Sequence, residues 1–226
     1  MEIEKNKNYE NIIIITDDGE ESDNTFLFCR VMKNLGKNSK LFYTEKKVSA
    51  KSNSITLNPF KFKANGPINC MDSFPADCLL FNIFNEKYDP SNTLFIFGIN
   101  EHNHFGYGNY VSSTTSLLIL AKHFGYDCFS ISSEIFLTED YIKDFFYYAT
   151  SLSSVLEKPT CFNINKLNLD FQFASISKTR FDEYEYLKTN RGPYYLLTYN
   201  QNPEDFKKGT DGWYQVHKRN YIVELF

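Results

Sequence analysis

The chain has 226 residues, 42% hydrophobic and 23% charged, which is enough apolar material for the core of one large domain. Its formal net charge of -4 and pI of about 5.6 argue against binding to duplex nucleic acid or to an anionic membrane surface. Five widely spaced cysteines without a CxxC pair argue against a disulfide framework and a structural zinc site, and predict buried, reduced thiols.

The first predicted elements are a buried strand and an amphipathic helix. Residues 11–16 contain four consecutive isoleucines and run into Asp17-Asp18-Gly19, which is typical of a buried parallel strand that ends in a turn. A helix is expected over residues 24–35, with Gly36 at the position where helices often end. Residues 41–43 predict a second strand, followed by a polar loop over 44–51.

The same alternation continues through the middle of the chain. Pro75 suits the first turn of a helix that reaches Phe84. A strand over 94–97 ends in Gly98-Ile99-Asn100, and Ser112, Ser113 and Thr114 are each suited to cap the next helix. A further strand is expected over 128–131, and a long helix from Thr138 toward Glu157.

This order of elements predicts one α/β domain over residues 1–226. Alternating strands and helices over 10–158 indicate a Rossmann-like, mostly parallel sheet flanked by helices. Residues 159–226 predict a β-rich C-terminal extension or hairpin arm. Its expected strands are an antiparallel one over 167–173 and further runs over 193–199 and 221–225. The polar N-terminus and the lack of a transmembrane-length apolar run predict a cytoplasmic protein.

Two strand ends carry polar side chains suited to a metal. Asp17 and Asp18 follow the first strand and Asn100 follows the strand over 94–97, and ligands of open α/β sheets gather at such carboxyl ends. Carboxylate and amide oxygens favour Mg²⁺ or Mn²⁺, and a helix beginning at Ser112–Thr114 offers N–H groups to a phosphate. An Asp-Asp-Gly turn and a Ser/Thr cap are also common without any ligand, so residue types alone leave both interpretations open.

Six segments, in order along the chain, resemble motifs of the SurE-type survival-protein family. They match its NDDG strand end, its SGxSxSIT loop, its TPADC helix start, its GINxGxN and YSGT stretches, its NxN strand and its terminal GTD segment. In this chain the segments are Ile12–Gly19, Ser49–Leu57, Phe74–Cys78, Gly98–Thr114, Asn163–Asn165 and Gly209–Val223.

The resemblance implies a divalent-metal-dependent phosphatase that hydrolyses nucleoside 5′- or 3′-monophosphates. Its metal ligands correspond to Asp17, Asp18, Ser49 and Asn100, with the two aspartates also catalytic and Asp17 suited to act as general base. Its phosphate-binding turn corresponds to Ser112, Ser113 and Thr114. The implied cofactor is one Mg²⁺ or Mn²⁺ ion, and the implied partners are the nucleotide substrate and a second copy of the chain.

Several positions depart from the family pattern. Ser113 replaces a glycine of the phosphate turn, and its Cβ is expected to crowd a bound phosphate. His102 and His104 replace a glycine and an asparagine, and they are either solvent-facing loop residues or additional ligands that would favour Mn²⁺ or Zn²⁺. The alternative function is therefore a catalytically weakened nucleotide-binding or scaffolding relative.

The β-rich C-terminal third has alternating strands and little apolar surface of its own. Such strands leave unpaired edges unless another element covers them. The family resemblance implies that C-terminal arms exchange between subunits, so we expect a homodimer, or a tetramer built from such dimers, with residues 194–226 contributing to the contact.

Overall fold

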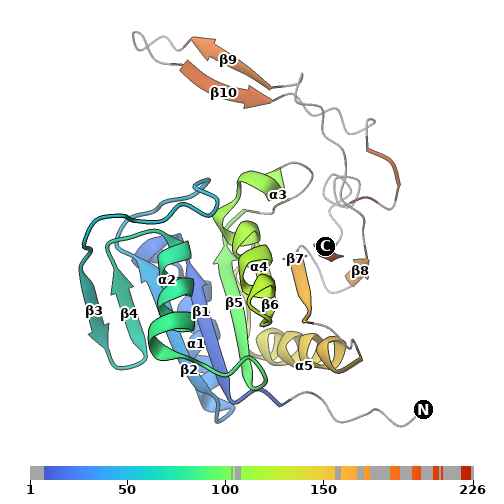
Figure 1. Cartoon of the computed structure of the whole chain (residues 1–226). Coiled ribbons are helices and arrows are strands. Elements are labelled where there is room, and N and C mark those ends of the chain that lie inside the picture. The colour runs from blue at the N-terminus through green and yellow to red at the C-terminus, as the bar shows by residue number, and fades with distance from the viewer. Residues whose placement is uncertain are drawn as a thin grey trace.

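The computed structural model places a nine-stranded sheet at the centre of the molecule, in the order β3-β4-β2-β1-β5-β6-β7-β11-β8 (Figure 1). It describes residues 8–102, 104, 108–155, 159–166, 171–173, 184–188, 195–199, 206–208, 210 and 220–224. Strands β4, β2, β1, β5, β6 and β7 run parallel to their neighbours, whereas β3 is antiparallel to β4 and β11 is antiparallel to β7. The chain therefore has the predicted Rossmann-like α/β fold.

The strands and helices have the following bounds. The strands of the sheet are β1 (Asn11–Thr16), β2 (Asn38–Thr44), β3 (Phe62–Asn65), β4 (Ile68–Met71), β5 (Thr93–Asn100), β6 (Asp127–Ser133), β7 (Cys161–Lys166), β8 (Phe171–Phe173) and β11 (Asn220–Glu224). The helices are η1 (Gly19–Glu21), α1 (Asp23–Asn34), α2 (Pro75–Phe81), η2 (Asn82–Glu86), α3 (Gly108–Val111), α4 (Ser113–His123) and α5 (Glu139–Val155).

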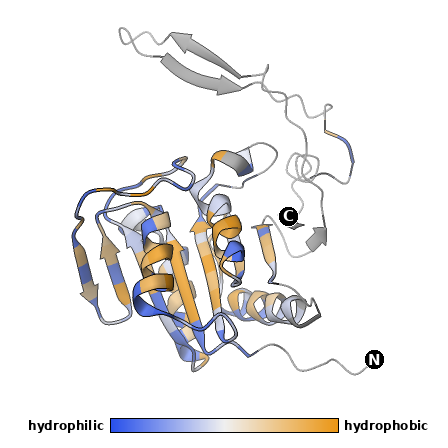
Figure 2. Ribbon diagram, viewed as in Figure 1, coloured by the Kyte–Doolittle hydropathy of each residue, from blue (hydrophilic) through white to orange (hydrophobic). Residues whose placement is uncertain are grey.

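The central strands of the sheet are buried on both faces because they alternate side chains between two hydrophobic layers. Ile12 and Ile14 of β1 point into a layer that contains the apolar sides of α1 and α5. Ile13 and Ile15 point the other way, into a layer formed with α2 and α4. The middle residues of β1 and β5 are accordingly hydrophobic (Figure 2). Double burial explains why β1 is a continuous isoleucine run rather than an alternating sequence.

The structure corrects two expectations about the strands. Strand β8 pairs parallel with β11, where the sequence predicted an antiparallel strand over 167–173, of which residues 167–170 lie outside the described part. The parallel core also extends beyond residue 158, because β7 continues the sheet next to β6. The hairpin of β3 and β4 was not predicted, since all four residues of β3 are exposed and carry no apolar periodicity.

The C-terminal region contains the predicted β structure in the parts that are described. Strands β9 (Tyr184–Lys188) and β10 (Tyr195–Tyr199) form an antiparallel pair of their own. Most of the predicted dimer contact at 194–226 lies outside the described residues. Within the described ranges, no helix has the length and apolar character needed to cross a membrane.

All five cysteines are free and buried, as predicted from their number and spacing. Cys29 belongs to the layer with α1 and α5, whereas Cys78, Cys128 and Cys161 belong to the layer with α2 and α4. Burial raises the pKa of the Cys29, Cys78 and Cys128 thiols, so these side chains are held in their neutral form.

Candidate functional site

Two neighbouring strands, β1 and β5, and the start of helix α4 bring the predicted site residues together. Strands β1 and β5 are parallel neighbours, so Asp17 and Asp18 after β1 and Asn100 at the end of β5 lie at the same edge. Helix α4 begins nearby, and its Thr114 hydroxyl donates a 3.5 Å hydrogen bond to Asp17 Oδ1. Asp17 and Asp18 are only 4% and 6% exposed, so two adjacent carboxylates are nearly removed from water.

The two carboxylates are placed where ionisation is unfavourable. Burial raises the pKa of Asp17, although the hydroxyls of Ser113 and Thr114 partly oppose the shift. Burial, followed by the charges of Asp17 and Glu101, raises the pKa of Asp18 to about 6. The Asp18 Oδ2 atom is buried and has no hydrogen-bond partner among the residues that the structure describes. A buried carboxylate oxygen that accepts no hydrogen bond would be stabilised by a positive charge beside it.

A hard divalent cation fits this donor set. Two carboxylates and an amide are oxygen donors of the kind that Mg²⁺ and Mn²⁺ prefer, and a cation would satisfy Asp18 Oδ2 and relieve the repulsion between the aspartates. Among the described residues, no group of three or more His, Cys, Asp or Glu side chains converges in a way that could hold an ion. A metal here would therefore need oxygen donors beyond the two carboxylates, such as the Asn100 amide, the Ser49 hydroxyl or water.

His104 fixes the orientation of the Asn100 side chain. Asn100 Nδ2 donates to the His102 carbonyl oxygen at 2.8 Å and lies 2.8 Å from His104 Nε2. A carbonyl only accepts, so the amide nitrogen must be on this side, and His104 Nε2 must accept from it. The amide oxygen of Asn100 is left for another partner. Burial, with a smaller effect from His102, lowers the pKa of His104 to about 4, consistent with a neutral imidazole.

The segment around His104 is fixed by two buried asparagines of β7. Asn165 Oδ1 accepts from the His104 backbone N–H at 2.8 Å. Asn163 and Asn165 both donate to the His104 carbonyl oxygen, at 3.1 and 3.2 Å. His104 Nε2 also lies 3.0 Å from Ser112 Oγ. The histidine therefore connects Asn100 to the start of α4. The sequence pattern indicated that His104 either faces solvent or binds a metal, and it did not predict this connection.

The first turn of α4 offers backbone N–H groups rather than free hydroxyls. Ser112 caps the helix by accepting from Thr115 N at 3.3 Å, and the Thr114 hydroxyl is used by Asp17. The N–H groups of Ser113 and Thr114 make no hydrogen bond within the described parts of the chain. Two free N–H groups at the positive end of a helix dipole, next to a carboxylate pair, can bind a phosphate whose charge a cation shares.

Ser113 attaches the loop that carries Ser49. The Ser113 hydroxyl accepts from Lys51 N at 3.2 Å and lies 3.4 Å from the Val48 carbonyl oxygen. Val48 N donates to the Asp17 carbonyl oxygen at 3.2 Å. Ser49 itself is exposed, and this attachment keeps it near the end of β1. The serine that replaces the family glycine thus has a structural use, which its sequence position alone did not reveal.

Asp77 anchors the far end of the same loop. Its carboxylate accepts from Thr56 N at 3.1 and 3.0 Å and from Phe74 N at 3.0 Å, which joins the loop to the beginning of α2. This contact ties the Ser/Thr-rich loop to the Pro-Ala-Asp sequence that begins α2. Asp77 therefore has a structural role. It lies far from the aspartate pair in the sequence, but it supports the loop that carries Ser49.

The raised pKa values of Asp17 and Asp18 predict that the stability of the protein depends on pH. The folded chain holds protons on Asp17 and Asp18 more tightly than the unfolded chain does, because their folded pKa values are raised from 3.8. Ionising them on going from about pH 4 to pH 6 therefore lowers the free energy of unfolding, for Asp18 by on the order of 2 kcal/mol. We expect the protein in EDTA to melt at a lower temperature at pH 7 than at pH 5, and Mn²⁺ to reverse the loss.

Asp18→Asn separates this effect from general pH effects. The variant should be more stable than the wild type at pH 7 in EDTA, and Mn²⁺ should raise its melting temperature much less. Differential scanning calorimetry of both proteins in EDTA at pH 5 and pH 7, and with Mn²⁺ at pH 7, makes the comparison. Equal pH dependence in the two proteins would contradict the placement of Asp18 in an unfavourable, cation-seeking environment.

Comparisons with known proteins identify the family and the fold of the chain. The family model described as "Survival protein SurE" matches residues 12–188. The crystal structure of the SurE protein from Aquifex aeolicus superposes with a TM-score of 0.72 at 19% sequence identity, covering 95% of this chain and 92% of that chain. Among curated proteins, none matches the chain by sequence. Because the family match extends over most of the chain and includes both aspartates, Asn100 and the start of α4, the chain belongs to the SurE survival-protein family.

Proposed function

We propose that this chain is a divalent-metal-dependent phosphatase that hydrolyses nucleoside 5′- or 3′-monophosphates to nucleoside and phosphate. Membership of the SurE family, a family of metal-dependent nucleotidases, supports a phosphatase role in general terms. The observation that carries the proposal is the buried pair Asp17 and Asp18, with an unpartnered Asp18 Oδ2 beside free N–H groups of α4. We assign the cation, Mg²⁺ or Mn²⁺, to Asp17, Asp18 and Asn100, with Ser49 as a further candidate ligand.

Each group has a separate task in this proposal. When bound, the cation supplies charge stabilisation at the phosphoryl group and lowers the pKa of water. The N–H groups of Ser113 and Thr114 hold non-bridging phosphate oxygens and orient phosphorus toward the aspartates. Asp17, whose pKa burial raises, is suited to accept the proton of the attacking water, while the Thr114 hydroxyl fixes the orientation of its carboxylate. His104 keeps the Asn100 amide oxygen turned away from the imidazole.

Phosphate release from a panel of nucleoside monophosphates, with Mg²⁺, Mn²⁺ or EDTA, tests the proposal. We expect release with at least one metal and none in EDTA. No release with every metal and nucleotide would overturn the catalytic proposal and favour the second candidate, a weakened nucleotide-binding or scaffolding relative. The observation that favours that candidate is Ser113, whose side chain occupies the turn where the family has glycine.

We also propose that the protein is a homodimer that exchanges C-terminal arms. The proposal is supported by the antiparallel pair β9–β10, which forms a sheet separate from the nine-stranded one. Light scattering should report at least a dimer for the full chain at micromolar concentration. A chain that ends at Gly192 should give monomer or aggregate, and a monodisperse full-length monomer would contradict the proposal.

A further inference from the structure

Two departures from the family motifs are brought together in the structure. Ala50 follows Ser49 where the motif SGxSxSIT has glycine, and Ser113 stands where the motif YSGT has glycine. The Ser113 hydroxyl accepts from Lys51 N at 3.2 Å and donates to the Val48 carbonyl oxygen at 3.4 Å. It therefore holds the chain on both sides of Ala50, so the two replacements belong to one arrangement.

Ala50 has a backbone conformation that disfavours alanine. Its φ is 58°, in the left-handed region, where a Cβ crowds the neighbouring carbonyl oxygen and glycine is the usual residue. Ser52, two residues later, has a φ of 49°. A short surface segment with two such residues does not keep this shape by local preference, so contacts with the rest of the protein must hold it.

Ser113 is placed to supply such a contact. It is completely buried in the first turn of α4, a helix that packs against the sheet. A side chain fixed in this way can hold a loop in one position relative to the core. The Ser113 hydroxyl also acts on the Asp17 carboxylate, where it opposes the rise in pKa that burial causes. The same side chain thus contacts both the aspartate pair and the loop that carries Ser49.

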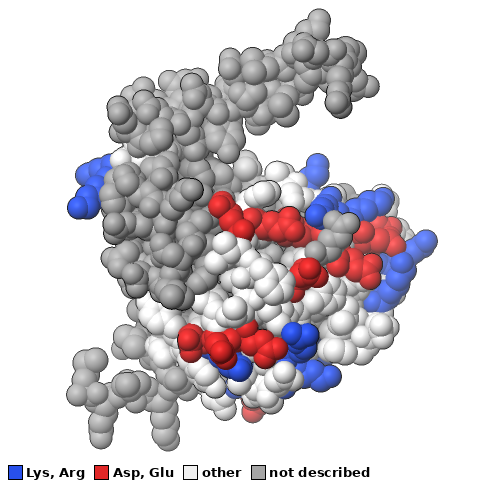
Figure 3. Space-filling view, turned by 180° about the vertical axis from the view of Figure 1, so that it is seen from behind, with Lys and Arg blue, Asp and Glu red and all other residues white. Residues whose placement is uncertain are grey.

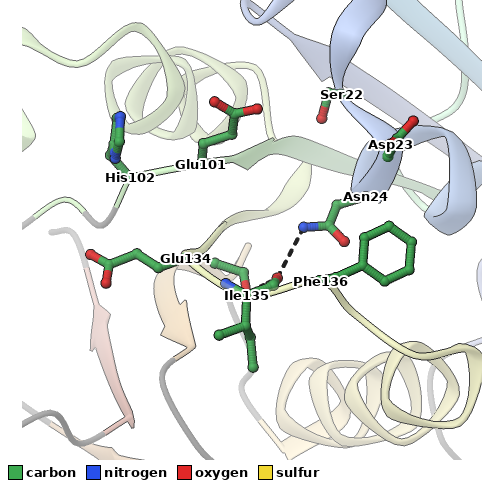
Figure 4. Close-up of a pocket in the computed structure, with 9 residues that line it drawn as sticks. Ser22, Asp23, Asn24, Glu101, His102, Glu134, Ile135 and Phe136 are labelled. Atoms are coloured by element: carbon green, nitrogen blue, oxygen red, sulfur yellow. Dashed lines mark hydrogen bonds between the residues drawn. The ribbon is translucent and has the colours of Figure 1, made fainter.

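A second loop at this edge of the sheet is held in the same way. The Asn24 side chain, at the beginning of α1, donates to the Ile135 carbonyl oxygen at 3.1 Å and accepts from Leu137 N at 2.8 Å (Figure 4). In both cases a polar side chain from the first turn of a helix bonds one N–H and one carbonyl of a loop that follows a strand. Ser113 therefore uses a kind of anchor that the fold also uses elsewhere.

We infer that Ser113 is a positioning residue that compensates for Ala50. Its hydroxyl holds the loop in the left-handed turn and thereby keeps Ser49 in place as the metal ligand that the proposed function assigns to it. The inference rests on that proposed function. It also changes the meaning of the serine, which was expected from the sequence only to crowd a bound phosphate. Glycine at residue 113 would remove the anchor unless residue 50 were glycine as well.

A double-mutant cycle at residues 50 and 113 tests the inference, with Mn²⁺ affinity measured by calorimetry. Ser113→Ala removes only the hydroxyl and should weaken Mn²⁺ binding about tenfold, because the loop can leave its strained shape and take Ser49 with it. Ala50→Gly alone should change the affinity little. The double variant should recover most of the lost affinity, because glycine adopts the left-handed conformation without an anchor. A double variant as weak as Ser113→Ala would overturn the compensation.

Ser116→Ala is the matched control. It removes a buried hydroxyl from the same helix, one that bonds the Ser113 carbonyl oxygen and not the loop. Its Mn²⁺ affinity should equal that of the wild type, and an equal loss in both alanine variants would overturn the anchoring role. Figure 3 shows a row of acidic side chains on the face opposite to that of Figure 1, which attract divalent ions without a specific site. The titrations therefore contain about 0.15 M salt, which screens such charges beyond about 8 Å.

Trypsin cleavage after Lys51, followed by mass spectrometry, separates failure of this inference from failure of the proposed function. Lys51 is exposed, and cleavage there requires the loop to open. Ser113→Ala should be cut about tenfold faster than the wild type, and Ser116→Ala at the wild-type rate. If the wild type binds Mn²⁺ and Ser113→Ala binds it equally well, the inference fails and the proposed function stands. If the wild type binds no Mn²⁺, the proposed metal site fails, and faster or unchanged cleavage of Ser113→Ala then supports or overturns the anchor.

Discussion

Asp17→Asn should abolish metal-dependent phosphate release, lowering kcat by at least about 100-fold, while the fold remains intact. An amide removes the negative charge that would hold the cation and the basic oxygen suited to accept a proton. It keeps the shape of the side chain, and its oxygen can still accept from the Thr114 hydroxyl. The backbone bond from Val48 N to the Asp17 carbonyl oxygen does not depend on the side chain.

The measurement is phosphate release at saturating Mn²⁺, together with calorimetry of Mn²⁺ binding. Asp140→Asn is a matched control, because it removes an exposed carboxylate from α5, far along the chain from the site. Its kcat should equal that of the wild type. A variant at Asp17 that retains wild-type kcat would rule out the proposed role of this residue, whatever its effect on stability.

Gly98→Ala should destabilise the protein by roughly 3 kcal/mol and weaken Mn²⁺ binding. Gly98 has a φ of 115°, a conformation that L side chains rarely adopt. A Cβ at this position would meet the Asn100 backbone nitrogen at 2.9 Å, and it would lie even closer to the Ile131 carbonyl oxygen. Both obstacles are backbone atoms of paired strands, so β5 must move away from β6 and carry Asn100 with it.

Gly66→Ala is the control for this variant. Gly66 also has a positive φ, of 60°, but nothing lies within 4 Å of an added Cβ. We expect a loss of about 1 kcal/mol, from backbone strain alone, and unchanged Mn²⁺ affinity. Urea unfolding and calorimetry of both variants make the comparison. Similar stability losses in the two proteins would show that the close approach of β5 to β6 at Gly98 can relax without cost.

The core of the fold was predictable because its signals are local. The isoleucine run of β1, the helix of α1 with Gly36 after it, and the Ser112 cap of α4 were all expected from nearby residues, and the structure has them close to those positions. The direction of β8 was wrong, since parallel or antiparallel pairing depends on which distant strand it meets. Hairpin β3–β4 was missed because an exposed edge strand carries little hydrophobic pattern.

The convergence of the candidate site residues was predictable, whereas their contacts were not. The resemblance named Asp17, Asp18 and Asn100, and the structure places all three at one edge of the sheet. The uses of His104 and Ser113 were not visible, because each depends on partners from other elements. Asn163 and Asn165 hold the His104 segment from β7, which is about 60 residues further along the chain. Such contacts depend on which distant strands and helices the fold brings together.

The buried cysteines can serve as natural probes of local unfolding in this chain. A thiol reagent reacts with a cysteine only when the surrounding structure opens, so the labelling rate of each cysteine measures local opening. Cys29 reports on the side of the sheet covered by α1 and α5, and Cys78, Cys128 and Cys161 report on the opposite side. Pulsed alkylation followed by peptide mass spectrometry could therefore show, without any engineered probe, which helical layer separates from the sheet first.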